Sequence, residues 1–93
     1  MANRLSDAEI QAKLATLTGW QQRDDQIQCT KTFDDFIEAI AFVNRLVEPA
    51  EAAGHHPDLS ISYNKVTIAL TTHDAGGLTE QDFAMAETLS KLS

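Results

Sequence analysis

The three histidines of this 93-residue sequence, His55, His56 and His73, fall within a stretch of 19 residues. An imidazole gains or loses its proton near neutral pH, so a group of histidines can hold a proton donor beside a proton acceptor. A dehydration needs this pair, because one group protonates the departing hydroxyl while another takes a proton from the neighbouring atom. The histidines therefore predict an acid–base site. The alternative is that they are surface residues without a chemical role.

A zinc site is the second chemical alternative, since zinc accepts three imidazoles and a water. No cysteine or carboxylate beside the histidines shows the spacing of a further metal ligand. His55 and His56 are also consecutive, and consecutive residues of a strand point to opposite faces. The acid–base interpretation is preferred, and no metal ligand is predicted.

The histidines flank a predicted β-hairpin. Segments 59–63 and 66–71 alternate polar and apolar residues, and the dipeptide 64–65 between them suits a tight turn. If 64–65 are the two turn residues, the extended register places His56 opposite His73, with Cβ atoms about 5 Å apart. The polar face of the hairpin would then end in imidazoles. Helices should cover its apolar face, which carries Leu59, Ile61, Val66, Ile68 and Leu70.

Five further segments complete the expected fold. Helical spacing and caps predict helices over 6–16 and 34–53 and a last helix that opens at 78–83. Two strands, 20–23 and 27–33, flank a polar turn. The order α-ββ-α-ββ-α predicts an α+β domain over residues 1–93, with a four-stranded antiparallel sheet and helices packed on one face.

The helix ends carry recognisable caps. Ser6 and Thr79 each precede an acid by three residues, which is the capping-box pattern. Asp34 or Thr32 is expected to cap the long helix. Pro49 lacks an N–H group and is expected to kink or interrupt that helix.

Composition narrows the function classes. The formal net charge is −7, which disfavours direct binding to nucleic acid or to an anionic membrane surface. Cys29 is the only cysteine, so no intrachain disulfide is possible. The first residues lack the apolar core of a signal peptide, and no apolar run reaches a membrane span of about 20 residues. A cytoplasmic location is expected.

A longer pattern surrounds the histidines and resembles the signature of the pterin-4a-carbinolamine dehydratases. Its fixed positions are Glu51, His55, His56, Pro57, Tyr63, His73 and Asp82. The resemblance implies a four-stranded antiparallel sheet with helices on one side. It also implies a cofactor-free enzyme that converts a 4a-hydroxytetrahydropterin to quinonoid dihydropterin and water. Such an enzyme recycles the pterin after aromatic amino-acid hydroxylases have used it.

The resemblance places the family's three active-site histidines on His55, His56 and His73. We expect His55 and His73 to form the acid–base pair and His56 to orient the pterin. Glu51 could tune a histidine or be a solvated helix end. Trp20 could stack on the pterin ring or belong to the core. Asp82 could hold the His73 loop, take part directly in catalysis, or be only a capping acid. Glu51, Trp20 and Asp82 are the predicted substrate-binding residues.

Two expectations concern partners. Some members of the family also act as dimerisation cofactors of a homeodomain transcription factor, so a non-catalytic binding module is the alternative function. The resemblance further implies dimers joined through their sheets and tetramers joined through helices. A domain with two open sheet edges and surplus apolar helix residues fits this, and a homodimer or homotetramer is predicted.

Overall fold

The chain folds in the predicted order α-ββ-α-ββ-α. The structure, a computed structural model, describes residues 3–92, so residues 1, 2 and 93 of the predicted domain lie outside it. Its elements are α1 (Asp7–Leu14), β1 (Gln21–Arg23), β2 (Gln26–Thr32), α2 (Phe36–Ala53), β3 (Asp58–Ser62), β4 (Lys65–Leu70), the short 3₁₀ helix η1 (His73–Ala75) and α3 (Glu80–Ser90).

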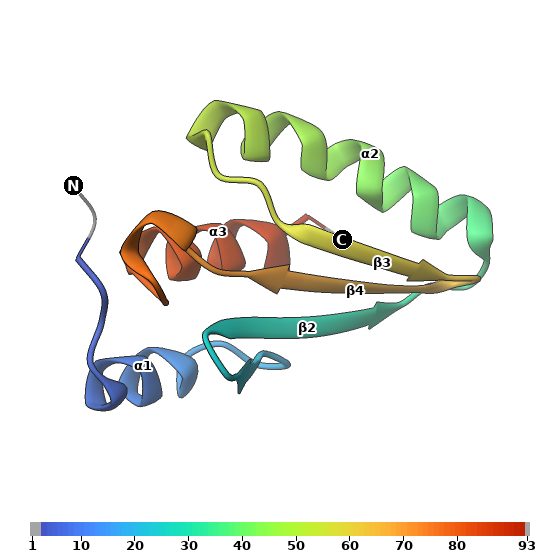
Figure 1. The fold of residues 1–93 in the computed structure, drawn as a ribbon. Coiled ribbons are helices and arrows are strands. Elements are labelled where there is room, and N and C mark those ends of the chain that lie inside the picture. The colour runs from blue at the N-terminus through green and yellow to red at the C-terminus, as the bar shows by residue number, and fades with distance from the viewer. Residues whose placement is uncertain (1–2, 93) are drawn as a thin grey trace.

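The four strands form one antiparallel sheet in the order β1-β2-β4-β3. The two hairpins meet through β2 and β4, where Cys29 lies opposite Ile68. Figure 1 shows α2 and α3 over one side of this sheet, and it brings the end of α2 and the start of α3 to the same end of the molecule. The predicted α+β class and the helix-covered sheet are confirmed.

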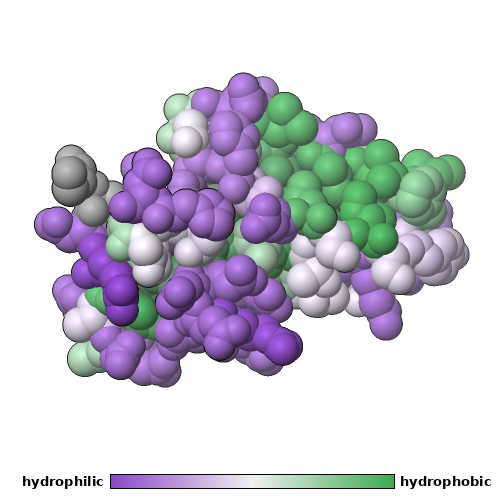
Figure 2. Space-filling model, viewed as in Figure 1, coloured by the Kyte–Doolittle hydropathy of each residue, from purple (hydrophilic) through white to green (hydrophobic). Residues whose placement is uncertain are grey.

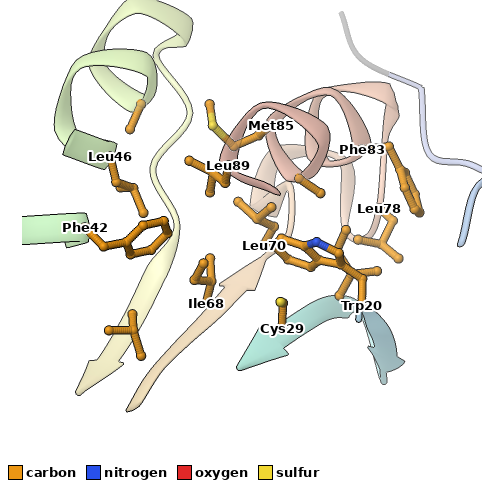
Figure 3. Close-up of a cluster of buried hydrophobic side chains, with 14 of the residues drawn as sticks. Trp20, Cys29, Phe42, Leu46, Ile68, Leu70, Leu78, Phe83, Met85 and Leu89 are labelled. Carbon is orange, nitrogen blue, oxygen red and sulfur yellow. The ribbon is translucent and has the colours of Figure 1, made fainter. Parts of the chain in front are cut away.

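Side chains from α2, α3 and the sheet meet in the core. Figure 3 shows Phe42 and Leu46 of α2 facing Ile68 of β4, with Met85 and Leu89 of α3 beside them. The inward residues of β4 are all buried, which confirms the covered face for that strand. On the edge strand β3, however, Leu59 and Ile61 remain 37% and 41% exposed. The prediction that helices cover them holds only in part: α2 runs alongside β3 (Figure 1), but β3 is the edge strand of the sheet and its apolar side chains stay partly exposed.

Lys31 is the one charged residue on the inward face of β2. Its Nζ donates to the Leu89 carbonyl over 3.3 Å and lies 5.0 Å from the centre of the Phe42 ring. Burial lowers the pKa of this lysine. Burial likewise raises the pKa of the neighbouring Cys29 thiol, which is free and enclosed in the core. Lys31 thus binds the C-terminal end of α3 to the sheet.

The register of the second hairpin differs from the prediction. Ser62 pairs with Lys65, so the turn consists of Tyr63 and Asn64, and Tyr63 takes a positive φ of 52°. The predicted turn at 64–65 is therefore wrong, and the pairing is shifted by two residues. A shift of two keeps every side chain on its face, because strand faces alternate with a period of two. The polar and apolar faces are as predicted, but the expected pairing of His56 with His73 is lost.

The helix caps agree with the sequence in two of three cases. The capping boxes at Ser6 and Thr79 are both present. Helix α2, in contrast, is capped by Asp35, whose Oδ1 accepts from the Glu38 amide over 2.8 Å, and neither Asp34 nor Thr32 has this role. The strands and the first two helices also begin or end one to two residues from their predicted bounds, as is usual for such boundaries.

Pro49 lies inside α2, and the helix continues past it to Ala53, so of the expected kink or interruption the interruption does not occur. The missing N–H group would have bonded the carbonyl of Arg45. Arg45 is on the exposed side of the helix, where water can take the place of that donor. Among residues 3–92, no helix is long and apolar enough to cross a membrane.

Candidate active site

All three histidines line one cleft of about 440 Å³ at the end of the sheet. Three segments meet there: the turn after α2, the end of β4 with η1, and the first turn of α3. The lining residues are Gly54, His55, His56, Thr71, Thr72, His73, Asp74 and Gln81. The sequence thus predicted the group of histidines correctly, although the cross-strand geometry it suggested was wrong.

Gly54 determines where His55 lies. It ends α2 in the left-handed conformation, with φ 61°, and the His55 amide then donates back to the Ala50 carbonyl over 3.2 Å. This is the hydrogen bond of a Schellman motif, and it needs a residue that tolerates positive φ. The chain therefore leaves the helix at a fixed angle, and His55 is directed toward α3.

His55 is held by a buried carboxylate. Its Nε2 lies 2.6 Å from Oδ1 of Asp82, which is 0% exposed, and the His55 side chain is itself only 12% exposed. A carboxylate can only accept hydrogen bonds, so Nε2 carries the hydrogen and Nδ1 is the free nitrogen. Asp82 consequently fixes both the orientation and the tautomer of this ring.

The other oxygen of Asp82 is also fully used. Oδ2 accepts from the Thr72 hydroxyl over 2.8 Å and from the Thr79 amide over 2.9 Å. Thr72 has donated its only hydroxyl hydrogen to Asp82, so the Thr79 hydroxyl must donate to Thr72 across their 2.9 Å contact. Asp82 is therefore both the capping acid of α3 and the partner of His55. Through Thr72 it also holds the loop that carries His73. The two structural roles predicted for Asp82, helix cap and support of this loop, are therefore both present, whereas its bond to His55 was not predicted.

His56 has a carboxylate partner too, but in a different setting. Its Nε2 lies 2.5 Å from Oε2 of Glu51, one turn back in α2, and both side chains are largely exposed. Exposed pairs of this kind are weak, because water competes for both groups. Glu51 thus orients His56 loosely, whereas Asp82 holds His55 firmly.

His73 enters the cleft from η1, the short helix that follows β4. Gly76 ends this helix with φ 73°, and its amide donates to the His73 carbonyl over 3.0 Å. Thr72 and Gly77 then pair as an isolated bridge that closes the loop. Among the described residues no side chain bonds to the His73 ring, which leaves both of its nitrogens for a ligand.

Trp20 does not line this cleft. It is 5% exposed, and its indole N–H donates to the Ser90 hydroxyl over 2.8 Å. Figure 3 places it in the core beside Leu70 and Cys29. Of the two alternatives for Trp20, the structure favours core packing over contact with a ligand.

Thr72 and Gln81 also line the cleft, and neither was predicted as a site residue. A signal for Thr72 was present, because it continues the inward positions 66, 68 and 70 of β4 and is polar. A polar residue at a buried position needs a hydrogen-bond partner, which here is Asp82. Gln81 had no such signal, since it lies in an ordinary first helical turn. Within residues 3–92, no cluster of histidine, cysteine and carboxylate residues is arranged to hold a metal ion.

Comparison with known proteins gives one consistent family. A protein from Trichormus variabilis is 61% identical over 93 residues, the full length of both chains. A protein from Thermosynechococcus vestitus is 60% identical over all of this chain and 98% of its own. Both bear the name of pterin-4-alpha-carbinolamine dehydratase. A crystal structure from Brucella melitensis, described as a transcriptional coactivator/pterin dehydratase, superimposes with a TM-score of 0.93. It is 36% identical and covers 97% of this chain and 98% of its own.

A more distant structure shares the fold alone. It is a pterin dehydratase-like RuBisCO assembly factor of the alpha-carboxysome, with a TM-score of 0.64 and 23% identity over 78% of this chain. The family model described as pterin 4 alpha carbinolamine dehydratase matches residues 3–92. The chain belongs to the pterin-4a-carbinolamine dehydratase family.

Proposed function

We propose that this protein is a hydro-lyase that removes water from a 4a-hydroxytetrahydropterin to give a quinonoid dihydropterin. The observation that carries the proposal is the convergence of His55, His56 and His73 on one cleft, with the first of them held by a buried aspartate. The product would return to the tetrahydropterin pool used by an aromatic amino-acid hydroxylase.

The reaction needs two proton transfers and no covalent intermediate. The lone pair of N5 expels the 4a-hydroxyl, which leaves as water once an acid has protonated it, and a base takes the proton of N5 as the C4a–N5 double bond forms. We assign these transfers to His55 and His73, which present free ring nitrogens from different segments. His56, loosely held by Glu51, orients the pterin. The rate gain then comes from positioning and proton transfer.

The direct test is the decay of a freshly prepared 4a-carbinolamine, followed by its ultraviolet absorbance with and without the protein. The protein should accelerate the decay in proportion to its concentration. A decay no faster than the spontaneous one, with folded protein, would refute the enzymatic proposal. It would favour the alternative, a binding module that acts as a dimerisation cofactor. That alternative draws on the Brucella melitensis relative, which is described both as a coactivator and as a pterin dehydratase.

Metal removal distinguishes the acid–base site from a zinc site. The proposed mechanism uses only imidazoles, so activity should persist after exhaustive treatment with a chelator. The measurement is the same ultraviolet assay, together with metal analysis of the purified protein. Activity that disappears on chelation and returns with added zinc would replace the acid–base assignment by a three-histidine metal site.

We further propose that a second copy of the chain covers an apolar surface formed by α2 and β3. Figure 2 shows hydrophobic residues gathered over this part of the molecule. The large apolar side chains exposed there are Phe36, Ile37, Val47, Leu59, Ile61 and Tyr63. β3 is also an edge strand, so its outer backbone groups can pair with another strand. Exposed apolar surface beside an open strand edge fits a self-complementary interface.

The expected assembly is a homodimer or homotetramer, measured by sedimentation equilibrium at micromolar concentration. Replacing Ile61 by lysine should shift the equilibrium toward the monomer, because a charge would be buried at the interface. As a control, Ala8→Lys places the same charge on the exposed side of α1 and should leave the mass unchanged. A wild-type protein that sediments only at 10.2 kDa would refute the assembly and leave the enzymatic proposal intact.

A further inference from the structure

A second cavity lies beside the histidine cleft, between α2 and α3. This groove of about 370 Å³ shares two lining residues with the cleft, His55 and Gln81. Beyond them its walls are mostly small or apolar, with Pro49, Ala52, Ala53, Ala84, Met85 and Thr88. The groove therefore continues from the cleft along the side of α3.

The opposite end of the cleft has a different character. There a cavity of about 320 Å³ shares Thr71 and His73 with the cleft, and its other walls include Asp24, Asp25 and Gln26. An apolar group placed among these polar residues would displace water from them without replacing their hydrogen bonds. A ligand in the cleft thus meets an apolar environment past His55 and a polar one past His73.

A pterin matches this asymmetry. Its pyrimidine ring carries an amino group and a carbonyl, whereas the substituent at C6 is attached next to N5 on the other ring. With C4a and N5 at the histidines, C6 and the pyrimidine ring extend in different directions. We propose that the groove between α2 and α3 receives the C6 substituent of the substrate, and that it selects substituents of hydrocarbon character. This inference rests on the proposed dehydratase function and deepens it.

Ala84 is the position that limits the substituent. It lies on the exposed side of α3, one turn after Gln81, so a larger side chain there would fill the groove without disturbing the core. Ala52 and Ala53 face it from the end of α2. Because all three are alanines, the groove exists through the absence of long side chains. We assign Ala84 as a specificity-determining residue, with no part in the proton transfers.

The test measures binding of 7,8-dihydropterins with hydrogen, methyl or propyl at C6, by titration calorimetry. Burial of each methylene is worth about fourfold in affinity, so the wild-type protein should bind the propyl compound at least about tenfold more tightly than the unsubstituted one. Ala84→Phe should reduce this gain to less than about threefold. The affinity for the unsubstituted compound should stay within about twofold of wild type.

Ala8→Phe is the matched control, since it adds the same side chain to the exposed side of α1 and should keep the full gain. Ala84→Leu should give an intermediate value, and thermal unfolding checks that each variant is folded. Equal affinity for the three compounds in the wild type would overturn the inference. The inference would also be overturned if the Ala84→Phe variant kept the full gain in affinity for the propyl compound but sedimented as a monomer where the wild type is an oligomer. In that case a second copy of the chain, and not the C6 substituent, would occupy the groove.

The outcome is separable from that of the proposed function. A wild-type protein that dehydrates carbinolamines but ignores the C6 substituent would refute only the groove. A protein without dehydratase activity toward any of the three carbinolamines would refute the function itself.

Discussion

Replacing His73 by alanine should lower kcat for a pterin 4a-carbinolamine by about 100-fold or more, the usual loss on removal of a general acid or base. The fold should survive, because the ring is exposed and no described side chain bonds to it. For His55 the informative substitution is glutamine. Its side-chain N–H can still donate to Asp82, so the change removes the imidazole and avoids leaving a buried carboxylate without a partner. The expected loss in kcat is again about 100-fold or more.

His56→Ala is the comparison within the same cleft. If this residue only orients the pterin, the variant should raise KM and change kcat by less than about tenfold. Stopped-flow absorbance gives both constants, and circular dichroism checks the fold. A His55→Gln/His73→Ala double variant that turns over like the wild type would refute the proposed site. A larger loss in kcat at His56 than at His55 would exchange their roles.

Local signals in the sequence predicted most of the elements. A capping box or an alternating strand depends on residues within a few positions, which is why Thr79 and the start of α3 were placed correctly. The exceptions are residues whose type disfavours the backbone conformation or the element in which they lie. Tyr63 takes a left-handed conformation that glycine or asparagine would be expected to take, and the turn moved by one residue as a result. Pro49 is tolerated because its cost is one hydrogen bond on an exposed helix side.

The chemistry of the site depends on contacts that spacing cannot reveal. His55 and Asp82 are 27 residues apart and meet because Gly54 ends α2 near the first turn of α3. Sequence patterns identified both residues as candidates. They did not show that the Asp82 carboxylate accepts hydrogen bonds from His55, Thr72 and the backbone of Thr79 at once. The two histidine–carboxylate pairs also differ in their exposure to solvent. The sequence gives no reason to expect that Asp82 is enclosed while Glu51 is solvated.

Because Asp82 is buried and Glu51 is exposed, replacing Asp82 by asparagine should have a large effect on catalysis. The amide oxygen can still accept from Thr72 and Thr79, so the N-terminus of α3 should keep its cap. Its NH₂ group would then face His55 and donate to Nε2, which moves the ring hydrogen to Nδ1. The free nitrogen would carry a proton where the wild type has a lone pair. We expect kcat to fall by about 100-fold with little change in unfolding temperature.

The matched control is Glu51→Gln, the same carboxylate-to-amide change beside the neighbouring histidine. Because that pair is exposed and solvent can replace its partner, kcat should change by less than about threefold. Nitrogen-15 shifts of the His55 ring report the tautomer directly and would not respond to a purely structural role. Asp82→Ala, by contrast, should lower the free energy of unfolding by about 2–4 kcal/mol, since it leaves buried donors unpaired. If Asp82→Asn kept wild-type turnover while the ring shifts confirmed the changed tautomer, the lone pair on Nδ1 of His55 could not be the group that moves the proton.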